Sequence, residues 1–236
     1  MPVSRRQRGS EPAPHGERVD QTYERLRELI VRNRLKPGTR VGEAALALRF
    51  GVSRTPIRAA LDRLALERFL VPSSAGLRVA LVVAPLTDAD VHELWMLMGA
   101  LEGAAVLGLH ELGRNALRRL SEAMRATNEE LTAVSRRRVR DTDRIGELMA
   151  QFHVLFMDAC AGPRLRALHE SVLPHVQRYE WAYDDLHDYE PSVTEHRAIC
   201  DAVESGAPGP TRRLIEQHWT DGMRRRLAQM QRRGAR

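Results

Sequence analysis

The stretch that most constrains the fold is GVSRTPIRAALDRLALERFLVP, which follows Phe50. Its apolar residues recur at helical spacing, at Ile57, Leu61 and Leu64. One face of this helix therefore packs against the chain's own core. Arg54 and Arg58 lie on the same helix, yet a charged group is costly to bury without a partner. The pattern predicts a helix that packs on one side and faces a polyanion on the other.

Basic charge is concentrated in the first third of the chain. The whole chain carries a formal net charge of +6. Residues 1–80 hold 16 Lys and Arg against 8 Asp and Glu, whereas residues 81–236 hold 21 against 23. The N-terminal part is thus basic and the rest is slightly acidic. This division indicates a nucleic-acid partner for the N-terminal part, and an enzyme has no need of it.

Three helices are predicted for the N-terminal part. They are expected at residues 19–34, at 43–50 and from Ser53 onward. Gly51 suits the left-handed residue that ends a helix, and Ser53 suits the N-cap of the third helix. Pro56 is tolerated in the first turn, where backbone amides lack internal partners. The turn between the second and third helices is therefore only a few residues long.

Two β-rich runs follow these helices, at residues 69–72 and 77–83, with a Ser-Ser-Ala-Gly turn between them. They predict a hairpin with Gly76 at its tip. Three helices and a hairpin make a winged helix-turn-helix, in which the third helix is the recognition helix. The residues expected to face DNA are Ser53, Arg54, Thr55 and Arg58. Arginine suits this role because its planar guanidinium group can donate two hydrogen bonds side by side to phosphate oxygens or to the edge of a guanine base.

From Pro85 onward the apolar residues recur at helical spacing, and no stretch has the alternation of a strand. Glycine, proline and charged residues interrupt this pattern often enough to predict about six helices. The fold class is therefore mostly α. We expect a disordered arm over residues 1–18, a winged helix-turn-helix domain over 19–84 and an all-α bundle over 85–232.

Neither a membrane span nor a secretory signal is expected. The chain lacks a run of about 18 apolar residues, and its first residues lack the apolar segment of a signal peptide. The cysteines, Cys160 and Cys200, form no disulfide framework. These features predict a cytoplasmic protein with reduced thiols.

The segment LKPGTRVGEAALALRFGVSRTPIRAALDRLALERFL closely resembles the DNA-binding module of GntR-family bacterial transcription regulators. The helical remainder resembles the FCD ligand-binding domain of the FadR-type branch, through FH at 152–153, EHRAI at 195–199 and QHW at 217–219. The resemblance implies a homodimer that binds a palindromic DNA operator under the control of a small metabolite. It implies that Arg54 and Arg58 enter the major groove and that the wing tip near Gly76 reaches the minor groove. Where such regulators often carry a further arginine, this chain has Ala44.

Many FCD domains hold a metal ion through one aspartate and three histidines. By this resemblance His153, His196 and His218 stand at the histidine positions, and Met149 replaces the aspartate. Three imidazoles and a water make an open site for a divalent metal such as zinc. The alternative is a pocket in which the histidines bond to one another, to Glu102 or to water.

The effector pocket is expected around Met98, Glu102 and Met149. Met98 stands where the resemblance implies an arginine that grips a carboxylate effector, four residues before Glu102. Two thioethers at such positions make a pocket more apolar and adaptable. Both methionines are also compatible with a plain core position, which leaves the effector class open.

The sequence favours a ligand-responsive transcription regulator, a repressor in the simplest case, and not an enzyme. Two alternatives stay open. One is a metal-dependent enzyme with a three-histidine site and a DNA-binding appendage, although no general-base carboxylate accompanies the histidines in the manner of an HExxH motif. The other is a constitutive DNA-binding dimer without an effector.

Overall fold

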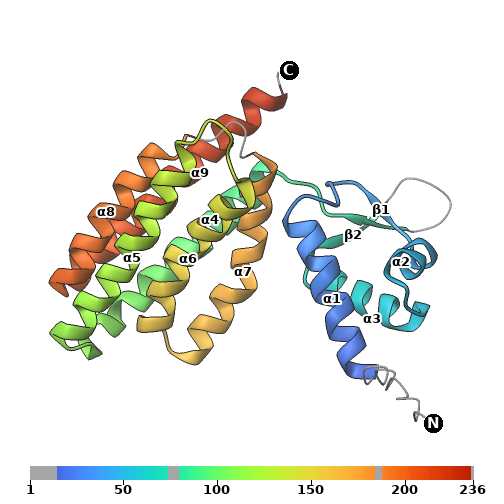
Figure 1. Ribbon diagram of the computed structural model, residues 1–236, viewed down its shortest axis with the longest axis horizontal. Helices are drawn as coiled ribbons and strands as arrows, with labels where there is room; N and C mark the ends of the chain where they lie inside the picture. The colour runs from blue at the N-terminus through green and yellow to red at the C-terminus, as the bar shows by residue number, and fades with distance from the viewer. Residues whose placement is uncertain (1–14, 74–79, 184–187, 235–236) are drawn as a thin grey trace, which may run out of the picture. The chain divides into compact units, whose positions relative to one another are not determined.

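The computed structural model describes residues 15–73, 80–183 and 188–234 (Figure 1). The chain divides into two compact units, one made of residues up to Ile30 with Leu35–Ala84 and the other of Val31–Arg34 with Pro85 onward. Within the described residues, the first unit combines helices with a small sheet and the second is helical. The mostly α architecture is confirmed, and no helix among the described residues is long and apolar enough to cross a membrane.

In the first unit the described residues form three helices and three short strands. They are α1 (His15–Val31), β1 (Arg40–Val41), α2 (Glu43–Phe50), α3 (Arg54–Leu66), β2 (Leu70–Ser73) and β3 (Ala80–Val83). The strand order is β1-β3-β2, and both pairs are antiparallel. Helix α1 begins at His15, so residues 15–18 are helical where the sequence predicted an arm, and the rest of that arm lies outside the described residues.

The local signals around α3 determine its ends. Gly51 ends α2 in the left-handed conformation with φ 67°, which glycine adopts without a steric cost. Ser53 is the N-cap of α3 with extended φ and ψ, but its side chain makes no capping hydrogen bond. Ile57, Leu61 and Leu64 are buried as predicted. They hold one face of α3 in the core of the unit.

The predicted hairpin forms from β2 and β3, with Val71 opposite Val82. Strand β1 was not predicted, because two residues are too short for a period-two pattern to be recognised. Its Val41 pairs with Leu81 and completes the sheet. The expected wing tip at Gly76 lies outside the described residues, so its placement stays a prediction.

In the second unit the described residues form six α-helices and one 3₁₀ turn. They are α4 (Asp88–Ala105), η1 (Val106–Glu111), α5 (Arg114–Ser135), α6 (Thr142–Cys160), α7 (Pro163–Ala182), α8 (Glu190–Ser205) and α9 (Pro208–Gly234). Thr87 caps α4 by accepting from the Asp90 amide, and Asp141 caps α6 by accepting from the Arg144 amide. The six α-helices agree with the predicted number, whereas η1 was not predicted.

Helices α4 and α9 approach each other closely, and glycines make this possible. A Cβ at Gly99 of α4 would lie 3.3 Å from the Trp219 Cβ of α9, and one at Gly222 of α9 would lie 3.1 Å from the Trp95 Nε1 of α4. The two tryptophan rings meet edge to face with centroids 6.4 Å apart. This contact places Trp95 and Trp219 in the core, where the ring centroid of Trp219 lies 4.7 Å from that of His153.

Candidate functional site

The predicted DNA-facing residues lie together on the exposed face of α3. Ser53, Arg54, Thr55 and Arg58 are exposed, whereas Ile57 in the same helix is buried. The structure thus separates the packing face from the charged face of this helix. The charged face presents two guanidinium groups to solvent within the first two turns.

Glu43, which the sequence analysis did not single out, holds Arg58. Arg58 donates from Nε to Glu43 Oε1 at 2.8 Å and from Nη2 to Oε2 at 2.9 Å. Such a bidentate pair fixes the plane of the guanidinium group. Glu43 opens α2, one residue before the exposed Ala44. The two residues are 15 positions apart, and no local pattern indicated that they meet.

His153, His196 and His218 converge from α6, α8 and α9. One ring nitrogen of each lies within 4.8 Å of those of the other two. The side chains are buried, at 4 %, 0 % and 5 % exposure. The His196 ring stacks on Phe152, with centroids 3.7 Å apart. Three histidines that are distant in the sequence therefore form one enclosed cluster.

Each histidine of the cluster is oriented by an acceptor at its Nδ1 atom. His153 Nδ1 lies 2.9 Å from Glu102 Oε2, His196 Nδ1 lies 3.0 Å from Asn128 Oδ1, and His218 Nδ1 lies 2.7 Å from Glu195 Oε2. These contacts leave the Nε2 atoms for the centre of the cluster. His196 Nε2 is buried without a hydrogen-bond partner among the described residues.

Burial favours the neutral form of His196 and His218. Burial holds the pKa of His196 well below its usual value, and charge on His218 and His153 lowers it further. Burial also lowers the pKa of His218, although Glu195 acts in the opposite direction. A neutral imidazole has a free lone pair, which is the form that binds a metal ion.

Carboxylates lie directly behind two of the histidines. Burial acts to raise the pKa of Glu102, but His153 and His169 outweigh it and keep this carboxyl ionised. Burial likewise opposes ionisation of Glu195, yet His218 and Arg225 lower its pKa to about 2. A carboxylate behind a ligating histidine fixes the ring and raises its basicity. The donor set and its supports therefore fit a divalent metal ion.

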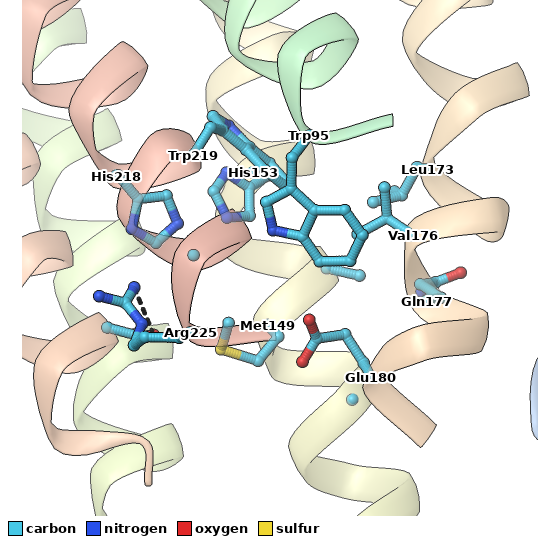
Figure 2. Close-up of a pocket in the computed structure, with 14 residues that line it drawn as sticks. Trp95, Met149, His153, Leu173, Val176, Gln177, Glu180, His218, Trp219 and Arg225 are labelled. Atoms are coloured by element: carbon cyan, nitrogen blue, oxygen red, sulfur yellow. Dashed lines mark hydrogen bonds between the residues drawn. The ribbon is translucent and has the colours of Figure 1, made fainter. Parts of the chain in front are cut away.

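A cavity lies beside the cluster (Figure 2), with a volume of about 40 Å³. Its lining residues come from α4, α6, α7, α8 and α9: Trp95, Gly146, Met149, Ala150, His153, Leu173, Val176, Gln177, Glu180, Ser192, His218, Trp219, Gly222 and Arg225. A single buried water needs about 10–15 Å³ by the same measure. The cavity therefore has room for a few waters or for part of a small ligand.

The three residues expected around the effector have different places. Met149 lines the cavity one helical turn before His153, as expected for the residue in the aspartate position. Met98 is fully buried in the core cluster and does not line this cavity. Glu102 lies behind His153 instead of in the cavity wall, and it also contacts His169 Nε2 at 3.2 Å. Of the three residues, Met149 alone lines this cavity, and the place of the effector stays a prediction.

Two family models match the chain. The model described as bacterial regulatory proteins of the gntR family matches residues 18–73, and the FCD domain model matches residues 93–221. The residues of α3 lie within the first match, and the three histidines lie within the second.

Relatives and solved structures agree with these matches. The chain is 33 % identical over 187 residues to the HTH-type transcriptional regulator YdhC of Bacillus subtilis, and the aligned residues cover 78 % of this chain and 80 % of the relative. It is 30 % identical over 161 residues to the Nta operon transcriptional regulator of Aminobacter aminovorans, and these residues cover 65 % of this chain and 69 % of the relative. A GntR transcriptional regulator from Rhodococcus sp. RHA1 has the same fold, with a TM-score of 0.72 at 24 % identity over 90 % of this chain and 98 % of that one. These relatives are transcription regulators, and the alternative of an enzyme gains no support from them.

Proposed function

The chain belongs to the GntR family of bacterial transcription regulators and carries an FCD effector-binding domain, and on this premise we propose how it acts. A small effector bound in the helical unit controls the affinity of the winged unit for a palindromic operator. The observation that carries the proposal is the pairing of an exposed basic recognition helix with an internal cavity beside three buried histidines. The simplest outcome of effector binding is release of the DNA, so that the protein is a repressor.

Arg54 and Arg58 read the operator from the N-terminal end of α3. A guanidinium group donates two parallel hydrogen bonds to O6 and N7 of guanine in the major groove. Glu43 already holds Arg58 in a bidentate pair, and this pair limits the directions in which Arg58 extends. Ser53 and Thr55 contribute contacts to the phosphates, which set the register of the helix on the duplex.

His153, His196 and His218 hold a divalent metal ion such as zinc. The support is the Nε2 atom of His196, which is buried without a hydrogen-bond partner in the described part of the chain, together with the acceptors behind all three rings. A bound ion would supply an open position for an oxygen atom of the effector. Met149 offers no negative charge there, so the effector supplies what the missing carboxylate would provide.

A homodimer places two recognition helices on the two halves of the operator. One winged unit makes few phosphate contacts, so paired half-sites raise the affinity at physiological salt. Helix α4 and the turn η1 that follows it support this proposal through Met96 and Leu107, which are 66 % and 69 % exposed. Large exposed apolar side chains are typical of a surface that a second subunit covers.

The experiment that tests the proposed function begins with selection of binding sites from random DNA duplexes. We expect a palindromic sequence to be enriched and to bind the full-length protein as a dimer in analytical ultracentrifugation. A reporter gene behind that sequence should be repressed when the protein is present. Selection without enrichment, or a single protomer on the selected site, would contradict the proposal.

A further inference from the structure

Glu43 and Arg58 join the start of α2 to the second turn of α3. Two N–H groups of Arg58 meet the two carboxylate oxygens of Glu43, at 2.8 and 2.9 Å. The Arg58 side chain is 66 % exposed and that of Glu43 is 34 % exposed, so the pair lies at the surface. Most surface ion pairs are weak, but a bidentate pair of arginine and carboxylate has the geometry that makes such a contact effective. Arg58 is therefore held in one orientation before DNA arrives.

The pair lies on the surface that the recognition helix presents to DNA. Arg58 follows Arg54 by four residues, and residues at this spacing share one face of a helix. The N-terminal part of a recognition helix contacts base edges in the major groove. Ala44 and Ala45, which follow Glu43, are exposed but have no polar side-chain group. At the start of α2, Glu43 is thus the side chain that can influence a base contact.

The hydrogen bonds to Glu43 leave one edge of the Arg58 guanidinium group available. A guanidinium group has five N–H donors, and the bonds to Glu43 use one on Nε and one on Nη2. The two N–H groups of Nη1 and the second N–H of Nη2 remain. Nη1 and Nη2 can still donate side by side to O6 and N7 of a guanine. The pair with Glu43 and a bidentate contact with guanine are therefore compatible.

The charge of the pair distinguishes a base contact from a phosphate contact. The hydrogen bonds and charge of Arg58 lower the pKa of Glu43, and the charge of Arg54 lowers it further, so Glu43 is ionised. Asp62 in turn acts on Arg58, so the surrounding charges add one cation and one anion. A backbone phosphate gains little from a neutralised cation, and the Glu43 carboxylate repels it. The O6 and N7 atoms of guanine are uncharged acceptors and do not meet this repulsion.

We propose that Glu43 is a positioning residue that directs Arg58 to a guanine of the operator and away from the backbone phosphates. This inference rests on the proposed function, because it assigns how the recognition helix distinguishes one DNA sequence from another. Arg58 then contributes to specificity, and it contributes little to the affinity for DNA of any sequence.

The double variant Glu43→Gln/Arg58→Ala tests the role of Arg58, because it replaces a neutral pair by neutral side chains. Fluorescence anisotropy compares it with wild type on the selected operator and on duplexes in which each base pair is replaced in turn. The variant should lose a preference for guanine of about 5- to 150-fold at one base pair of each half-site. The slope of log affinity against log salt should equal that of wild type. A slope reduced by about 0.9 for each bound protomer would show that Arg58 binds a phosphate, and this result overturns the proposal.

The single variant Glu43→Gln tests the role of Glu43, because it keeps the shape of the side chain and removes its charge. At the same base pair this variant should retain a guanine preference of about two-fold or less. On a duplex without the palindrome it should bind several-fold more tightly than wild type at about 0.1 M salt, because the unpaired Arg58 gains a phosphate contact. A merely structural role would weaken binding to both kinds of duplex. An unchanged guanine preference in a folded Glu43→Gln overturns the proposal.

Two further variants serve as the control and the safeguard. Glu24→Gln removes an exposed carboxylate of α1 that lies 3.4 Å from Arg27, and it should leave the guanine preference unchanged. If it relaxes the preference as much as Glu43→Gln does, net charge alone is responsible and the proposal is overturned. If Glu43→Gln fails to fold by circular dichroism, Arg58→Ala decides the matter. A loss confined to one guanine supports the proposal, and an equal loss on every duplex overturns it.

The failure of this inference is distinguishable from the failure of the proposed function. A protein that selects a palindrome and represses the reporter, but keeps its guanine preference in Glu43→Gln, is a regulator in which Glu43 has no such role. A protein that reads guanine through Arg58 and Glu43, but binds as a single protomer or does not repress, contradicts the proposed function and leaves this assignment intact. A wild-type protein that selects no sequence contradicts both.

Discussion

The recognition helix and the histidine cluster place their polar groups in opposite environments. Arg54 and Arg58 are exposed and come from one short segment. His153, His196 and His218 are buried and come from three helices. An exposed site needs only a partner of opposite charge, because water solvates its groups until that partner binds. A buried site needs internal partners for its polar atoms, and Glu102, Asn128 and Glu195 provide them for the Nδ1 atoms of the three histidines.

This difference predicts that the buried site is the more sensitive of the two to a single substitution. His196→Ala removes one of three metal ligands. Loss of an acceptor behind a ligand typically costs 10–100-fold in metal affinity, so loss of a ligand should cost more than about 100-fold. Calorimetry with zinc on protein stripped by dialysis measures this change. His110→Ala, which removes an exposed histidine, is the control and should leave the affinity unchanged.

At the exposed site the effect should be smaller and restricted to DNA. Arg54→Ala and Arg58→Ala should each weaken operator binding by about 1–3 kcal/mol, which is roughly 5- to 150-fold. Fluorescence anisotropy on the selected operator gives the affinity, and thermal unfolding should be unchanged because both side chains are exposed. Arg118→Ala on α5 removes an exposed arginine of the other unit and serves as the control. Equal affinities for all three variants and wild type would show that α3 does not read the DNA.

The pH dependence of stability should come from the buried site. The unfolded chain protonates His196 and His218 near pH 6.5, whereas the folded chain does so only at lower pH because their pKa values are lowered. Stability is therefore full above about pH 6.5 and is lost as the pH falls below it, by at most about 1.4 kcal/mol per pH unit for each histidine. Denaturant titrations of metal-free protein between pH 7.5 and 5 measure this slope. The His196→Gln variant should give a flatter profile of stability against pH. A profile identical to that of wild type would show that His196 does not contribute to the pH dependence.

The smallest expected effect is an increase in zinc affinity. Met149→Asp places a carboxylate one turn before His153 on the wall of the same cavity. Zinc should bind roughly ten-fold more tightly than in wild type, because the new ligand carries negative charge. Met149→Asn is the control, since an asparagine side chain has the shape of aspartate but no negative charge. If neither wild type nor Met149→Asp binds zinc, the three histidines form no metal site.

Elements with local signals could be predicted from the sequence. The end of α2 at Gly51 and the start of α7 at Gly162-Pro163 depend on residues at the boundary itself, and the structure places both there. Met98 lies in the core cluster with Val91 and Trp95. This is the plain core position that the sequence left open for it beside the effector pocket that the resemblance implied.

Asn128 and Glu195 support the histidine cluster and could not be predicted in this way, whereas Glu102 was already expected as a histidine partner in the alternative to a metal site. Asn128 contacts His196 across 68 positions, and Glu195 contacts His218 across 23. Such pairs depend on how three or four helices pack together, and the spacing of residues along one helix does not indicate which helices it contacts. The histidines themselves were found through resemblance to a family, whereas Asn128 and Glu195 were not found at all.

The free hydroxyl of Ser53 has a consequence for the folding of α3. A serine at the N-cap normally accepts a hydrogen bond from an amide of the first turn, but here the side chain makes none, and Pro56 has no amide to offer. The first turn of α3 therefore begins with open backbone donors next to Arg54, in the position where a helix N-terminus binds a phosphate. An operator phosphate can complete this turn. The operator would then act as the missing cap of the helix that reads it, so that amide exchange in this turn slows only when DNA is bound.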